Sequence, residues 1–87
     1  MLFELGKLVA TPAVLAAVPR SVIDLAVARH LSGDWGDMSD ADKQTNEQAL
    51  KDGGRLFSAY QVREDTRIWI ITEADRSAST VLLPSDY

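Results

Sequence analysis

Residues 56–73 decide the fold, and they read Leu-Phe-Ser-Ala-Tyr-Gln-Val-Arg-Glu-Asp-Thr-Arg-Ile-Trp-Ile-Ile-Thr-Glu. Residues 56–62 alternate between two sets of side chains with a period of two, which is typical of a strand. Residues 67–73 are rich in Ile, Trp and Thr, which favour strands, and the turn residues Glu64 and Asp65 lie between the two runs. The stretch therefore predicts a β-hairpin.

A third strand is predicted after the hairpin. Residues 74–77, Ala-Asp-Arg-Ser, form a second predicted turn, and the apolar run Thr80–Leu83 follows before Pro84 ends it. Three successive strands joined by short turns predict an antiparallel meander.

Residues 11–31 have the spacing of two helices. Thr11 is a suitable N-cap for the first, with Pro12 at the next position, and Pro19 separates this helix from the second. In the second helix the apolar residues recur at three- and four-residue spacings, which predicts one buried face, and Gly33 ends the helix.

A third helix, Asp40–Lys51, is predicted after the N-cap Ser39. This helix is poor in apolar residues, so we expect it to lie on the surface and to dock through Ala41, Ala49 and Leu50. Residues 5–10 are predicted as a short strand or an extended entry segment. The fold class is therefore α+β, a single domain over residues 1–87 in which N-terminal helices precede a three-stranded antiparallel β-meander packed on them.

Composition limits the function classes. Hydrophobic residues make up 46% of the chain, enough for a small core, and cysteine is absent, which excludes disulfides, thiolate nucleophiles and zinc sites that need Cys. Residues 8–18 form an apolar run like that of a signal peptide, but Glu4 and the helix start at Thr11 favour a mature helix. No run reaches the roughly 20 apolar residues of a membrane span. We expect a soluble, cytoplasmic protein.

The net charge of −4 lies within residues 34–52. That segment has six acids and two bases, whereas the rest of the chain has seven of each. An acidic face favours a cationic partner and disfavours nucleic acid, whose binding needs clustered Lys and Arg. The predicted partner-binding residues are Asp34, Trp35, Asp37, Asp40, Asp42, Glu47 and Asp52. Trp35 has two predicted roles: a hydrophobic plug that holds the loop on the core or, if exposed, an interface anchor.

No metal ion or cofactor is predicted. A calcium loop of the EF-hand type needs oxygen ligands at positions 1, 3 and 5, Gly at 6 and Glu at 12. A loop starting at Asp40 would have Thr45 at the glycine position and Lys51 at the glutamate position, and one starting at Asp34 would have Gly36 as a ligand. The aspartates therefore do not have the ligand spacing of such a site.

The sequence contains no convincing catalytic set. His30, the sole histidine, lies near the end of the second helix, where it is expected to cap carbonyls or to pack at the edge of the core. Glu73 and Asp75 follow a predicted strand, with Arg67 and Arg76 nearby, and such a set suggests a toxin-like small ribonuclease as the alternative. That enzyme would use Glu73, Arg67, Arg76 and His30. That enzyme would need a basic surface for RNA, which this composition does not provide.

Several segments resemble a family of small proteins encoded on bacterial plasmids and mobile elements, sometimes labelled with type I restriction systems. The segments are residues 5–7 with 10–12, 33–37, 55–60 and especially 68–77, Ile-Trp-Ile-Ile-Thr-Glu-Ala-Asp-Arg-Ser. The resemblance implies an inhibitor of a host defence system, of the anti-CRISPR or anti-restriction type, that docks its acidic face on a basic nucleic-acid-binding surface of a protein complex. The other alternative is an accessory subunit of a mobile-element complex. We expect a monomer or weak homodimer.

Overall fold

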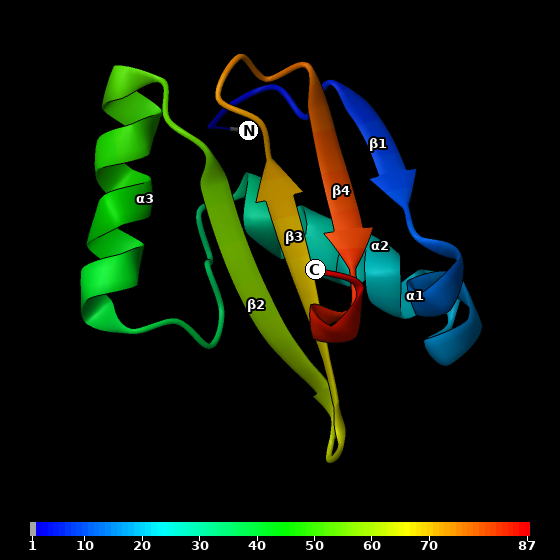
Figure 1. Ribbon diagram of the computed structural model, residues 1–87. Helices are drawn as coiled ribbons and strands as arrows, with labels where there is room; N and C mark the ends of the chain where they lie inside the picture. The colour runs from blue at the N-terminus through cyan, green and yellow to red at the C-terminus, as the bar shows by residue number, and fades with distance from the viewer. Residues whose placement is uncertain (1) are drawn as a thin grey trace.

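The computed structural model describes residues 2–87, which form a four-stranded sheet with helices against one face and one edge (Figure 1). In chain order the elements are β1 (Lys7–Ala10), α1 (Pro12–Ala17), α2 (Arg20–Leu31), α3 (Asp40–Asp52), β2 (Leu56–Arg63), β3 (Thr66–Thr72), β4 (Ala78–Leu82) and a short 3-10 turn, η1 (Pro84–Asp86). The strand order across the sheet is β1-β4-β3-β2.

The α+β class is confirmed, but the prediction of a wholly antiparallel sheet of three strands that follows the helices is wrong. A strand precedes the helices, because β1 joins the sheet as a fourth strand and pairs parallel with β4, which makes the sheet mixed. The predicted hairpin and third strand are present as β2, β3 and β4. β1 has no alternating pattern because it is a short edge strand that is exposed along most of its length. Its pairing also joins residues about seventy positions apart, which no local turn signal specifies.

The core lies between one face of the sheet and the helices α1 and α2, which are behind the sheet in Figure 1. α2 buries one face, with Ile23, Ala26 and Val27 toward the sheet, as the helical spacing predicts. The strands contribute inward-facing side chains such as Ile68 and Ile70, both fully buried. The opposite face of the sheet carries no helix in the described chain, and only the C-terminal turn η1 lies in front of it.

α3 lies beside β2 at the edge of the sheet (Figure 1). The predicted cap is confirmed, since the Ser39 hydroxyl accepts a hydrogen bond from the Asp42 N–H. Ala49 and partly buried Leu50 dock the helix as expected, but Ala41 is exposed, and the other buried residue of α3 is Asn46. An asparagine is not an obvious docking residue in a sequence, and its role lies in hydrogen bonding to β2.

The free edge of β2 is hydrogen bonded by side chains and by a loop. The Asn46 amide donates to the Phe57 carbonyl oxygen at 2.7 Å and accepts from the Phe57 N–H at 3.0 Å. Two residues further along the strand, the Ala59 N–H donates to the Trp35 carbonyl and the Ala59 carbonyl accepts from the Asp37 N–H. Unpaired backbone N–H and C=O groups at a strand edge cost free energy when they are buried and can pair with a strand of another chain when they are exposed. These contacts therefore protect the edge.

Glycine is required where the loop reaches β2. Gly36 has a φ of +77° and forms an isolated parallel bridge with Ala59. A Cβ atom at this position would collide with the Ala59 carbonyl oxygen and with the Tyr60 ring. The loop can therefore follow the strand only because residue 36 has no side chain.

We expect Gly36→Ala to lower the free energy of unfolding by about 3 kcal/mol, because it adds a collision to the strain of a left-handed residue. Gly53→Ala is the matched control, since Gly53 also has a positive φ, of +84°, but has open space around it. Gly53→Ala should lower the free energy of unfolding by about 1 kcal/mol. Urea unfolding measures both, and equal losses would show that close approach to β2 does not constrain residue 36.

Candidate functional site

The uncovered face of the sheet carries an aromatic cluster. Phe57 on β2 and Trp69 on β3 lie with ring centroids 4.9 Å apart, and Tyr87 meets Trp69 edge-on at 5.8 Å. Phe57 and Trp69 are half-buried, and Tyr87 is 73% exposed. Aromatic rings that remain accessible on a sheet face are typical of binding surfaces.

A groove of about 460 Å³ runs between this cluster and α3. Phe57, Ala59 and Trp69 line it from the sheet, while Asp42 lines it from the first turn of α3 and Asp37 from the preceding loop. It is the largest of the pockets described in residues 2–87. We name this feature the α3 groove.

Two arginines line the α3 groove, and each already has a partner. Arg55 forms an ion pair with Glu73 at 3.6 Å. Arg67 donates from Nε and Nη2 to the Gln61 side-chain oxygen at 3.3 and 3.2 Å. Because Gln61 and Arg67 are cross-strand neighbours, the sheet itself holds this guanidinium in place.

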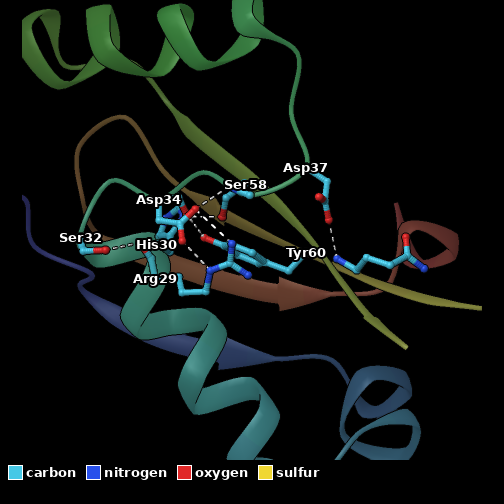
Figure 2. Close-up of polar contacts among 9 residues, drawn as sticks. Arg29, His30, Ser32, Asp34, Asp37, Ser58 and Tyr60 are labelled. Carbon is cyan, nitrogen blue, oxygen red and sulfur yellow. Dashed lines mark hydrogen bonds and ion pairs between the residues drawn. The ribbon is translucent and has the colours of Figure 1, made fainter. Parts of the chain in front are cut away.

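Asp34, a predicted partner-binding residue, is hydrogen bonded within the protein through both its carboxylate and its carbonyl. Its carboxylate accepts from Arg29 Nε at 2.6 Å and Nη2 at 3.1 Å, and its carbonyl accepts from the Tyr60 hydroxyl at 2.7 Å. The Arg29 guanidinium lies 4.6 Å from the centre of the Tyr60 ring, so the three side chains form one unit (Figure 2). The hydrogen bond from Arg29 holds the pKa of Asp34 below its usual range. Asp34 therefore ties the end of α2 to the loop.

Trp35 is a plug, as one of its two predicted roles requires. The side chain is 3% exposed and packs with Ala49 and Leu56. Its indole N–H donates to Glu47 Oε2 at 2.7 Å, which satisfies the polar end of the ring. Glu47, also a predicted partner-binding residue, thus helps to fasten α3 to the core.

Of the remaining predicted acids, two accept hydrogen bonds within the protein and two are exposed at the start of α3. Asp37 accepts the Gln61 N–H at 2.7 Å and completes the protection of the β2 edge, while its side chain also lines the α3 groove. Asp40 and Asp42 are exposed in the first turn of α3, where the helix dipole stabilises acidic side chains. Asp52 accepts from Gln48 at the far end of the same helix.

The structure thus brings only Asp37 and Asp42 of the seven predicted residues into the α3 groove. Sequence reasoning missed Phe57, Trp69 and Arg55, and it considered Arg67 only for the ribonuclease alternative. The alternation in residues 56–62 places Phe57 on the face opposite the core, and this signal could have identified the first of them.

His30 lies in the interior, not at a pocket. Its side chain is fully buried, with Nδ1 2.6 Å from the Ser58 hydroxyl and Nε2 2.9 Å from the Thr72 hydroxyl. Phe3 and Trp35 meet its ring edge-on at centroid distances of 5.2 and 5.6 Å. The expected cap at carbonyls or position at the core edge is therefore wrong, because hydroxyl groups on two strands give this histidine a fully buried site.

The hydrogen-bond chain fixes the tautomer of His30. The Ser79 hydroxyl donates to the Leu5 carbonyl at 2.8 Å, so it must accept from Thr72, which lies 2.7 Å away. Thr72 then has only its lone pairs to offer His30, which must donate from Nε2. Nδ1 of a neutral ring is an acceptor, so Ser58 donates to it.

Burial keeps His30 neutral. Desolvation, assisted by the positive charge of Arg76, lowers the pKa of His30 from 6.5 to about 4. Since both ring nitrogens are bonded within the protein, this residue has no lone pair or proton to exchange with a substrate.

The four residues of the ribonuclease alternative do not converge. His30 is buried beneath the sheet, bonded to Ser58 and Thr72, whereas Arg67 lines the α3 groove on the other face. Arg76 donates to the carbonyls of Gly54 at 2.6 Å, Glu73 at 3.0 Å and Ala49 at 3.2 Å, so it fastens the end of α3 to the sheet. Glu73 is paired with Arg55.

In residues 2–87, no group of three or more His, Asp or Glu side chains is arranged to hold a metal ion. None of the helices in this part of the chain is both long and apolar enough to span a membrane. Comparison with known proteins found no match among family models, curated proteins or solved structures.

The structure predicts that the acids differ in their effect on stability. Asp37→Ala and Glu47→Ala should each lower the free energy of unfolding by about 1 kcal/mol or more, because each leaves a donor without its partner. Asp40→Ala and Asp52→Ala are matched controls and should change it little, because neither carboxylate holds a group of the loop or of the core, and Asp52 accepts only from the exposed Gln48 side chain. Equal losses in thermal unfolding across the four variants would contradict the internal roles.

Stability should fall on mild acidification because of His30. The folded-state pKa is lowered, so stability is complete above the unfolded pKa of 6.5 and is lost as the pH falls toward 4, by about 3 kcal/mol in total. Urea unfolding between pH 7 and 4 should show the loss, and His30→Gln should remove its slope. If that variant does not fold, NMR titration of the His30 ring in the wild type measures its pKa directly. A pKa near 6.5 would contradict the prediction.

Proposed function

We propose that the protein is a non-enzymatic binding protein that docks the exposed acids of α3 and the α3 groove on a basic surface of a partner protein. The observation that carries the proposal is the pairing of an uncovered aromatic cluster with free carboxylates at its border. Phe57, Trp69 and Tyr87 lie on the face without helices, and Asp42 lines the same groove from α3.

The composition of this face supports binding to a protein. Tryptophan, tyrosine and arginine dominate the energetics of protein interfaces, because they combine large apolar area with a polar group. Trp69, Tyr87 and Arg67 occupy neighbouring positions on this face of the sheet. Nucleic acid is a weaker candidate, since the arginines here are engaged and carboxylates line the same groove.

A basic partner is supported by the charges that the fold leaves unused. Asp40 and Asp42 project from the first turn of α3, and neither carboxylate takes part in an ion pair within residues 2–87. Exposed carboxylates of this kind attract a positively charged surface at a distance and set the orientation of encounter.

The proposed biological role is inhibition of a host defence system, of the anti-CRISPR or anti-restriction type. A groove built for phosphate in such machinery is rich in Lys and Arg, and an acidic protein surface can occupy it in place of nucleic acid. Five of the seven residues first assigned to this contact make hydrogen bonds within the chain, namely Asp34, Trp35, Asp37, Glu47 and Asp52. The proposed contact therefore depends on Asp40, Asp42, the second carboxylate oxygen of Asp37 and the aromatic cluster.

Affinity capture from a lysate of bacteria carrying defence systems tests the proposal. The wild type should retain a nucleic-acid-handling complex, and the double variant Asp40→Asn with Asp42→Asn should retain at least tenfold less, because charge pairs at an interface contribute on this scale. The control is Asp24→Asn with Asp65→Asn, which makes the same change of net charge in α2 and in the hairpin turn.

Tyr87→Ala should also weaken capture, whereas Leu25→Ala, an exposed apolar residue on α2, should not. A partner retained equally by all variants would contradict the assigned surface. Cleavage of RNA by the purified protein would contradict the non-enzymatic assignment and favour the ribonuclease.

A further inference from the structure

We infer that the α3 groove accepts an arginine side chain of the partner, which stacks on Trp69 and pairs with Asp37 and Asp42. This inference rests on the proposed function and adds the chemistry that the groove recognises. It depends on the shape of the groove, on which of its charges are unused, and on an arrangement that the protein already contains.

The shape of the groove comes from a small residue between large ones. The outward side chains along β2 are Phe57, Ala59 and Gln61, and the cross-strand neighbour of Ala59 is Trp69. A methyl group therefore stands where both flanking positions and the neighbouring strand carry larger side chains. The space above Ala59 is bordered by two aromatic rings on the sheet and by α3 on the other side.

Among the charges of the groove that belong to no ion pair, two are carboxylates, Asp37 and Asp42, and one is the Arg67 guanidinium, so their sum is negative. Asp37 uses one carboxylate oxygen for the Gln61 N–H, and neither Asp37 nor Asp42 belongs to any of the three ion pairs of residues 2–87. Arg55 is paired with Glu73, whereas Arg67 keeps its charge and is held in position by hydrogen bonds to the neutral Gln61 amide. A cationic group therefore complements the groove better than an anionic group does.

A guanidinium suits this site better than an ammonium group. Its plane can stack on the indole of Trp69 while its edge donates two hydrogen bonds to a carboxylate, whereas a lysine offers a compact, strongly hydrated charge. The same arrangement occurs elsewhere in this protein. Arg29 lies 4.6 Å from the Tyr60 ring centre and donates two hydrogen bonds to Asp34 (Figure 2).

NMR titration with three short blocked peptides tests the inference. The peptides are identical except for a central arginine, lysine or citrulline, and citrulline has the shape of arginine without its charge. The arginine peptide should shift the amide signals of residues 37, 42 and 59 and the indole signal of Trp69. It should bind about tenfold more tightly than the citrulline peptide, with lysine between them.

A charge-matched pair of variants locates the effect. Asp42→Asn should weaken the arginine peptide several-fold, whereas Asp52→Asn, at the other end of α3, should not. Equal affinities for arginine and citrulline, shifts confined to another surface, or no shifts up to about 10 mM peptide would each overturn the inference.

The result can be separated from that of the proposed function. If Asp40 and Asp42 are needed to capture a protein partner but the peptides show no preference for arginine, the binding function stands and the arginine occupant is wrong. If arginine binds in the groove but capture does not depend on the groove, the site is correct and the proposed function is wrong.

Discussion

The hydrogen bonding of the free edge of β2 is the constraint on which the rest of the candidate site depends. A strand edge must have its N–H and C=O groups satisfied or covered. Here the loop before α3 and the Asn46 amide provide the partners for Phe57, Ala59 and Gln61. Because the loop follows the strand so closely, α3 begins beside it and lies along the edge. The α3 groove is therefore a consequence of the way in which the edge is closed.

The interior is organised around a second polar arrangement, the chain from Ser58 through His30, Thr72 and Ser79 to the Leu5 carbonyl. These five groups come from α2, three strands and the N-terminal segment, so the chain fixes the position of α2 on the sheet. No buried side-chain polar atom in residues 2–87 lacks a partner, which makes such an arrangement tolerable in an apolar core. The cost is sensitivity to protonation of the histidine.

The sequence was sufficient to predict those features that depend on local patterns. The period of residues 56–73 predicted the hairpin, and Ser39 predicted the start of α3, because caps and alternation act over a few residues. It was not sufficient for β1, whose partner lies at the other end of the chain, or for the site of His30, whose hydrogen-bond partners are on β2 and β3. Contacts across such separations carry no local signature.

Charge counting located the acidic segment but could not divide it by role. An aspartate that protects a strand edge and one that projects into solvent look alike in a sequence, and only the partners of each carboxylate distinguish them. Asp34 and Glu47 are engaged by Arg29 and by the Trp35 indole, so binding a partner through them would break contacts that hold the loop in place. Asp40 and Asp42 are stabilised by the helix dipole, which needs no other side chain. Their carboxylates can therefore meet a cationic group without any loss to the fold, and for this reason the border of the α3 groove is a better candidate contact than the acidic segment as a whole.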